Sequence, residues 1–158
     1  MIKKIGRLVM LAIAITLVVF SVYRIIDDFA ILRDNFGSNW QEIFRRFFSG
    51  DFHDLGPAVD FLWRILYIIV GLTALAVAIS GHSGLWSTIA AGLMLGFFIT
   101  NIVLQVRAGT FNFQEYILTL SLDVVLQLIY ITGLILVKYG NHRENRELRE
   151  FRKYKKNH

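Results

Sequence analysis

The chain contains no cysteine and only one proline, Pro57, among its 158 residues. The absence of cysteine excludes disulfide bonds, thiolate metal sites and a cysteine nucleophile. Charge is also scarce: 18% of the residues are charged and 55% are hydrophobic, whereas a soluble domain has about 25% and about 45–50%. This composition excludes a disordered chain, a coiled coil and a disulfide-rich secreted module.

The scarcity of charge is concentrated in one segment. From Ile65 to Val106, 42 consecutive residues include no Asp, Glu, Lys or Arg. As a helix this segment is about 63 Å long, which is enough for two crossings of a hydrocarbon core about 30 Å thick. Two glycines and two serines between Ser80 and Gly84 predict the turn between the crossings. The sequence therefore predicts a multi-pass membrane protein.

Two further apolar segments flank this hairpin. The predicted fold class is all-α, a four-helix transmembrane bundle forming a single membrane domain, with spans at 5–26, 58–79, 85–106 and 116–137, an outer loop at 27–57 and a basic tail at 138–158. A cleaved signal peptide is the alternative for the first span. However, Ser21 to Arg24 lacks the small-residue site that cleavage requires, so we expect an uncleaved anchor.

Basic residues are divided unevenly between the two sides of such a bundle. Eleven lie at the N-terminal end of the first span or after the last span, against six in or beside the other connections. Because cytoplasmic segments carry the excess of Lys and Arg, we expect a cell-membrane protein with both termini in the cytoplasm. The basic tail is expected to contact anionic lipid headgroups. We expect no nucleic-acid partner, since the tail lacks a folded platform and has no aromatics from Asn141 onward beyond Phe151 and Tyr154.

The outer loop contains an apolar face with helical spacing. Its members fall at i, i+3, i+4, i+7 and i+8 and are Trp40, Ile43, Phe44, Phe47 and Phe48. Ser38 can cap the start of this helix and Gly50 can end it. We expect an amphipathic helix in the outer membrane interface, which covers the bundle, docks a partner, or does both.

The same loop contains the segment Asp-Phe-His-Asp at 51–54. A metal site needs three or four converging ligands with suitable spacing, and the sequence offers no second cluster to complete this one. We interpret the segment as a solvated turn and predict neither a metal nor a cofactor.

The third predicted span has a small residue at every fourth position. These residues are Thr88, Gly92, Gly96 and Thr100. In lipid, helices gain little from burying apolar surface, so small residues that allow close backbone approach mark helix contacts. We expect this stripe to pack inside the bundle, against Gly71, Ala74 and Ala78 of the second span, rather than to form a homodimer.

Polar residues gather toward the outer ends of three spans. They form i, i+4 pairs, which are Asp60 and Arg64, Asn101 and Gln105, and Asp123 and Gln127. Charges at membrane depth are costly and normally face the bundle interior or water. Arg64 and Asp123 share a predicted depth, so we expect them to pair. The cluster is either a structural ion pair that fixes helix register or an outward-opening pocket for an ion, a proton or a lipid headgroup.

The sequence contains no paired-carboxylate, Ser–His or metal-binding spacing near a surface, so we assign no catalytic residue. The small size, the aromatic face and the basic tail favour an accessory or scaffold subunit of a membrane complex. The alternatives are a small oligomeric transporter or channel with an outer-leaflet polar pocket, and an enzyme that modifies membrane lipids. The expected partners are the lipid bilayer and either another membrane protein or a second copy of the chain.

Overall fold

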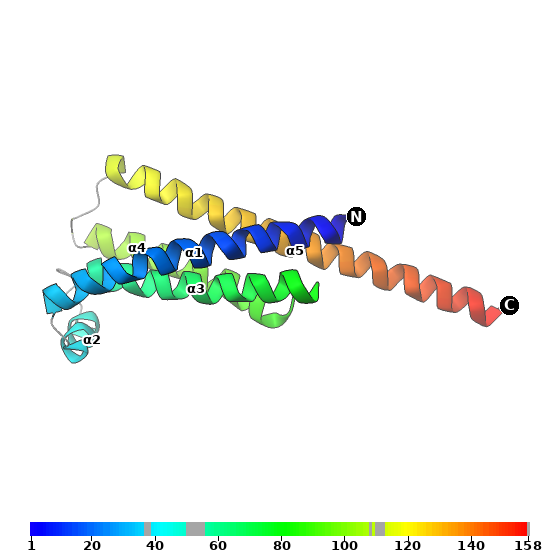
Figure 1. The fold of residues 1–158 in the computed structure, drawn as a ribbon, viewed down its shortest axis with the longest axis horizontal. Helices are drawn as coiled ribbons and strands as arrows, with labels where there is room; N and C mark the ends of the chain where they lie inside the picture. Colours follow the sequence, from blue (N-terminus) through cyan, green and yellow to red (C-terminus); the bar gives the residue numbers. More distant parts are fainter. Residues whose placement is uncertain (37–38, 50–55, 108, 110–112, 158) are drawn as a thin grey trace.

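The computed structural model describes residues 1–36, 39–49, 56–107, 109 and 113–157, and within these it is all-helical. The helices are α1 (Ile2–Phe36), α2 (Trp40–Ser49), α3 (Gly56–Ser80), α4 (Leu85–Arg107) and α5 (Phe113–Asn157). Figure 1 shows α1, α3, α4 and α5 running along one common direction, with α2 at one end of the bundle. The C-terminal part of α5 extends alone beyond the opposite end.

Four of the helices are long and apolar enough to cross a membrane. Their candidate spans are Ile2–Ile31, Ala58–Ser80, Leu85–Arg107 and Ser121–Arg152. The predicted fold class is confirmed at this level. The predicted turn is also confirmed, because α3 ends at Ser80 and α4 begins at Leu85.

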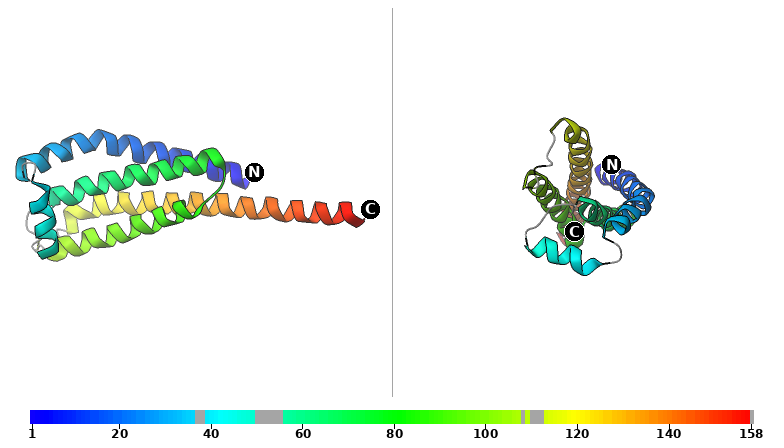
Figure 2. Two further views of the ribbon diagram at one scale, coloured as in Figure 1. Left: turned by 90° about the horizontal axis from the view of Figure 1, so that it is seen from below. Right: turned by 90° about the vertical axis from the view of Figure 1, so that its left-hand side faces the viewer.

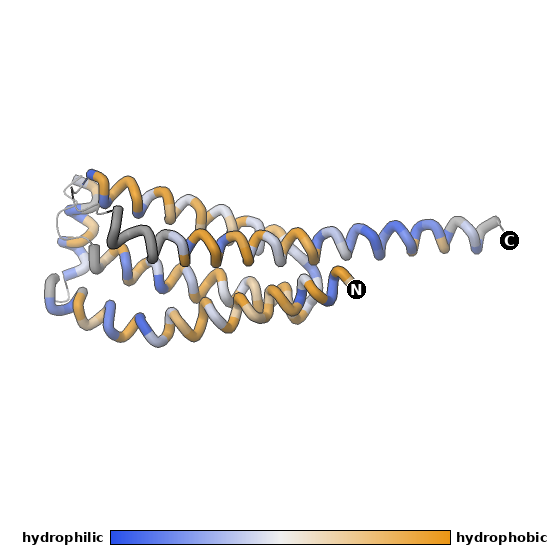
Figure 3. The backbone as a smooth tube through the Cα atoms, turned by 90° about the horizontal axis from the view of Figure 1, so that it is seen from above, coloured by the Kyte–Doolittle hydropathy of each residue, from blue (hydrophilic) through white to orange (hydrophobic). Residues whose placement is uncertain are grey.

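The first and last long helices extend well beyond their predicted spans. α1 continues through Phe36 into the segment expected to be a loop, and no glycine or proline interrupts it after Gly6. α5 continues through the tail, where Arg143 pairs with Glu147 at 3.0 Å and Arg146 pairs with Glu150 at 3.2 Å. Such i, i+4 pairs support an exposed helix. Figure 3 shows this protruding end as hydrophilic and the bundle as largely hydrophobic.

The core lies where α1 packs against α3 and α5. Side chains with no exposed surface include Met10, Leu17, Tyr67, Val70 and Tyr130. Three glycines bring the backbones together. A Cβ atom on Gly6 would lie 2.8 Å from the Val137 nitrogen, and one on Gly140 would lie 2.9 Å from the Lys3 Cα. One on Gly71 would lie 3.3 Å from the Ala14 oxygen. α1 is therefore the helix around which the bundle is closely packed.

Side chains of α1 and α5 hydrogen-bond the turn between α3 and α4. Arg7 donates hydrogen bonds from Nε to the Ala78 carbonyl at 2.6 Å and from Nη2 to the Ile79 carbonyl at 2.9 Å. The last carbonyls of a helix lack intrahelical partners and carry partial negative charge, so a guanidinium stabilises them. From α5, Asn141 Nδ2 donates to the Gly81 carbonyl at 3.0 Å. Gly81 itself has a φ of 68°, which glycine adopts without strain.

The small residues of α4 do not pack inside the bundle, so that expectation is wrong. All four members of the stripe, Thr88, Gly92, Gly96 and Thr100, are exposed. Among the described residues, no atom lies within 4 Å of a Cβ placed on Gly92 or Gly96. Their expected partner Gly71 faces α1 instead. A different face of α4, with Ser87, Ala90 and Met94, is the buried one.

α2 forms where the apolar spacing predicts it, but a different residue caps it. The side-chain oxygen of Asn39 accepts a hydrogen bond from the Glu42 N–H at 3.3 Å, which is the contact of an N-cap residue. Arg46 and Arg45 then hydrogen-bond the Glu42 carboxylate and lower its pKa. Ser38, Gly50 and the 51–54 segment lie outside the described residues.

The apolar residues of α2 are divided between the bundle and the outside. Trp40 packs against Phe61 of α3, with ring centroids 5.9 Å apart, and Ile43 is buried. Phe44 and Phe48 are 59% and 82% exposed. The side chain of Phe47 lies outside the described part of the structure. α2 therefore covers the end of the bundle with one part of its predicted apolar face and leaves another part uncovered.

Candidate functional site

A cavity of about 620 Å³ lies between the four long helices, in the half of the bundle nearest α2. Its walls are Thr16, Leu17, Phe20 and Arg24 from α1, Asp60, Trp63 and Arg64 from α3, Asn101 and Gln105 from α4, and Leu122, Asp123 and Leu126 from α5. Polar and charged groups thus share one space with aromatic and aliphatic side chains. The lining residues that do not lie on α1, α3 or α4 are Leu122, Asp123 and Leu126 of α5. Of these, Asp123 belongs to the predicted polar cluster.

The cavity brings together most of the predicted polar cluster. Asp60, Arg64, Asn101, Gln105 and Asp123 all line it. The sixth member, Gln127, is buried on α5 one turn from Asp123 and does not line the cavity. Its Nε2 has no hydrogen-bond partner among the described residues. The sequence placed the three i, i+4 polar pairs at similar depths, and five of their six side chains line the same cavity.

The shared depth of Arg64 and Asp123 had predicted that they pair. In the structure they do not. Arg64 Nε instead donates to Asp28 Oδ2 of α1 at 3.0 Å, and the two side chains are 18% and 16% exposed. The guanidinium also lies over the Phe20 ring, 5.0 Å from its centroid. The prediction failed because Asp28 was assigned to the loop, whereas α1 continues as a helix and carries Asp28 alongside α3.

Asp123 has a neutral partner. It accepts a hydrogen bond from the phenolic hydroxyl of Tyr67, which is fully buried on α3. Trp63 packs against Tyr67, with ring centroids 4.8 Å apart, and stacks on Phe97 of α4 at 5.0 Å. This aromatic wall holds the phenol in place beneath the carboxylate.

Two other charged residues of the cavity are unpaired. Within the described residues, Arg24 and Asp60 make no hydrogen bond or ion pair. The amide residues are arranged differently, since Gln105 Nε2 donates to Asn101 Oδ1 at 3.2 Å along α4. The cavity therefore combines a neutralised pair, an amide pair, and charged groups that remain available to a ligand.

The sequence analysis missed three residues of this site, namely Arg24, Asp28 and Tyr67. The spacing contains a signal for each of them. Tyr67 lies seven residues after Asp60 and three after Arg64, so it shares their helix face. Arg24 and Asp28 are an i, i+4 pair at the end of the first span. Ending the span at residue 26 separated that pair and hid it.

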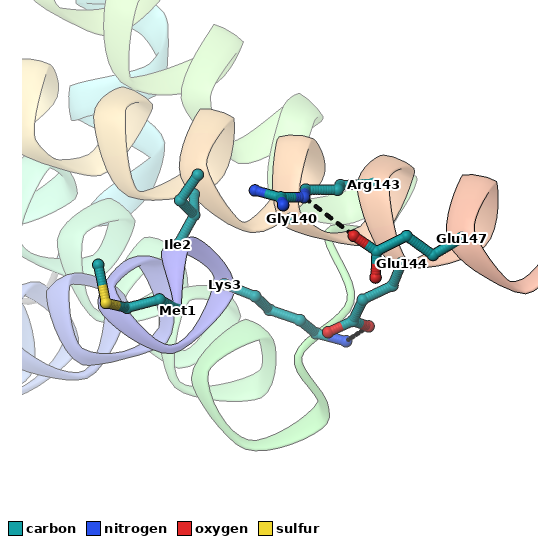
Figure 4. A pocket seen from close by; sticks show the side chains of 7 residues that line it. All are labelled: Met1, Ile2, Lys3, Gly140, Arg143, Glu144 and Glu147. Carbon is teal, nitrogen blue, oxygen red and sulfur yellow. Dashed lines mark hydrogen bonds and ion pairs between the residues drawn. The ribbon is translucent and has the colours of Figure 1, made fainter.

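A second cavity, of about 480 Å³, lies at the opposite end, where α1 begins beside α5. Figure 4 shows Lys3 reaching Glu144, with a nitrogen–oxygen distance of 2.8 Å, and Arg143 reaching Glu147 along α5. These charges satisfy one another rather than form a binding site, and the Lys3–Glu144 pair joins α1 to α5.

The described residues contain no group of three or more His, Asp or Glu side chains able to hold a metal ion. The first cavity presents polar and charged side chains within an otherwise apolar bundle. No family model, curated protein or solved structure matches the chain.

Proposed function

We propose that the chain is an accessory or scaffold subunit of a membrane complex and that it contacts its partner along α4. The support is the exposed small-residue stripe, whose two glycines have open space where a neighbouring helix would fit. In lipid, such residues let a second helix approach closely and gain van der Waals contact. α4 is also the least engaged long helix, because 11% of its most apolar window is buried, against 39% for α3.

Native mass spectrometry of the chain, purified from its own membranes in mild detergent, tests this proposal. We expect a stoichiometric heteromer that the double change Gly92→Leu and Gly96→Leu dissociates into a folded monomer. Ala76→Leu is the control, since it places a leucine at an exposed position of α3 and should retain the partner. A heteromer that survives the double change would show that the contact lies elsewhere.

We further propose that both termini lie in the cytoplasm and that α2 lies on the outer side of the cell membrane. In Figure 2 the N-terminus, the α3–α4 turn and the tail of α5 are at one end of the bundle, and α2 is at the other. The end with the termini also carries the excess of basic residues, which favours the cytoplasmic side. There the tail can contact anionic headgroups, at about 1 kcal/mol per basic residue near the surface.

Thiol labelling on intact cells should report this orientation. The chain has no cysteine, so Ser38→Cys and Asn157→Cys each introduce a single thiol. An impermeant maleimide should label the first variant on intact cells and the second only after the cells are opened. The opposite pattern would reverse the orientation.

On the same view, α2 is an amphipathic helix in the outer membrane interface. Phe44 and Phe48 are exposed while Ile43 faces the bundle. Exposed aromatic side chains on a short helix with arginines beside them favour the boundary between headgroups and acyl chains. α2 would then both cover the bundle end and anchor it in the outer leaflet.

A second candidate function is a small oligomeric transporter or channel. The observation that favours it is the cavity, because charged side chains at membrane depth are functional candidates by default. A homo-oligomer in the mass spectrometry experiment would favour this function over the accessory subunit.

A further inference from the structure

We infer that the cavity between the four long helices binds an ammonium group carried on an apolar body. The ammonium can come from a lipid headgroup or from a soluble amphipathic amine. This inference does not depend on the association proposed along α4, because the cavity lies inside the chain.

The size of the cavity indicates a molecule rather than a bare ion. Its volume of about 620 Å³ falls within the range of about 300–1,000 Å³ that small-molecule sites occupy. A water molecule, by comparison, takes about 30 Å³. A single cation would leave most of this space unfilled, and the described residues offer no set of acidic or histidine ligands that could hold a metal ion.

The charges on the wall indicate a cation. Arg64 is neutralised by Asp28 at 3.0 Å, which leaves one positive residue, Arg24, and two carboxylates, Asp60 and Asp123. The partner of Asp123 is the neutral phenol of Tyr67, and no ion pair among the described residues neutralises its charge. With both carboxylates ionised, the free charges sum to one negative. An ammonium group would complement this negative charge.

The remaining lining suits the apolar body of such a ligand. Trp63 is 4% exposed, and Leu17 and Leu126 complete an apolar surface beside the carboxylates. Aromatic rings also attract cations through their negative faces. Arg64 already uses this interaction, since its guanidinium lies 5.0 Å from the Phe20 centroid. The wall thus provides both parts of an amphipathic amine with a matching surface.

The cavity opens at the surface of the bundle, because exposed side chains line part of it. The close approaches of α1 to α5 are at Gly6, Gly133 and Gly140, and Figure 1 shows the two helices diverging toward the α2 end. Two lining residues at this side, Phe20 and Leu122, are exposed. In a membrane this opening would face acyl chains, so an amphipathic ligand can enter from the bilayer.

Tryptophan fluorescence of the full chain in dodecyl maltoside tests the inference, because this detergent carries no ammonium group. Trp40→Phe and Trp86→Phe leave Trp63 as the single reporter on the cavity wall. We expect 2-phenylethylamine to change its emission in a saturable way at neutral pH, and 3-phenylpropanoate, its anionic analogue, to have no such effect. Equal binding of both compounds, or saturable binding of neither, would overturn the inference.

Charge variants locate the binding. Asp60→Asn should fold, because Asp60 has no partner among the described residues, and should weaken phenylethylamine binding about tenfold or more. Asp123→Asn should have a similar effect, and Glu150→Gln on the tail, which removes the same charge far from the cavity, should have none. Unchanged affinity in both asparagine variants would contradict the assigned site, whatever the second variant does to folding.

Lipid competition distinguishes the two sources of the ammonium. Adding phosphatidylethanolamine to the micelles should displace the probe if the natural ligand is a lipid headgroup, and should leave it bound if the ligand is a soluble amine. Phosphatidylglycerol is the amine-free control. Displacement by both lipids alike would show that the cavity recognises phosphate or acyl chains rather than an ammonium, and would refute the inference.

Discussion

Replacing Gly6 by alanine should destabilise the bundle by about 1–3 kcal/mol, as overpacking of a closely packed interface does. The added Cβ would lie 2.8 Å from the Val137 nitrogen and 2.9 Å from the Leu136 Cβ. A backbone atom cannot rotate away as a flexible side chain does, so α1 and α5 must separate. The free energy of unfolding, measured by titrating the chain from dodecyl maltoside into sodium dodecyl sulfate, would show the loss.

Gly92→Ala is the matched control for this prediction. It makes the same chemical change in a helix of the same bundle, but nothing lies within 4 Å of the new Cβ. Alanine is also favoured over glycine in a helix interior, by up to about 1 kcal/mol. We therefore expect unchanged or slightly higher stability. Equal losses in the two variants would mean that Gly6 is not at a closer helix contact than Gly92.

These two glycines show why the sequence predicts the helices better than their packing. The α3–α4 turn follows from Ser80 to Gly84 alone, because turn chemistry and lack of charge are local properties. Whether a glycine faces a neighbour depends on how the whole helix is rotated. Gly92 and Gly96 have the familiar spacing and face outward, whereas Gly133 and Gly140 are seven residues apart and face α1.

The polar site shows the same limit in another form. Residue depth can be estimated from the span boundaries, and depth correctly placed Asp60, Arg64 and Asp123 around one cavity. Pairing within that cavity depends on which side chains lie closest to one another. It can be predicted only if every charged residue near the cavity has been considered. Asp28 was left out because α1 runs beyond the apolar segment. Its helical extension follows from the absence of a helix breaker, a signal that hydropathy does not contain.

Removing Arg64 should have the second large effect, because it leaves the carboxylate of Asp28 unpaired at a site where that side chain is 16% exposed. Breaking a buried pair from one side costs about 3–5 kcal/mol, whereas replacing both partners by apolar residues is often neutral. We expect Arg64→Leu to lower the free energy of unfolding by an amount in this range. Adding Asp28→Leu to that variant should recover most of the loss.

The decisive comparison is with a second double variant, Arg64→Leu with Asp123→Leu. Asp123 bonds to Tyr67 and not to Arg64, so removing Asp123 does not relieve the unpaired carboxylate of Asp28, and we expect this second double variant to recover none of the Arg64→Leu loss. Recovery in this variant, together with additive losses in the Arg64 and Asp28 variant, would mean that Arg64 pairs with α5 in the membrane. If stability recovers only in the double variant that combines Arg64→Leu with Asp28→Leu, the ion pair lies between α1 and α3. The charge of Asp123 is then available to a cationic ligand.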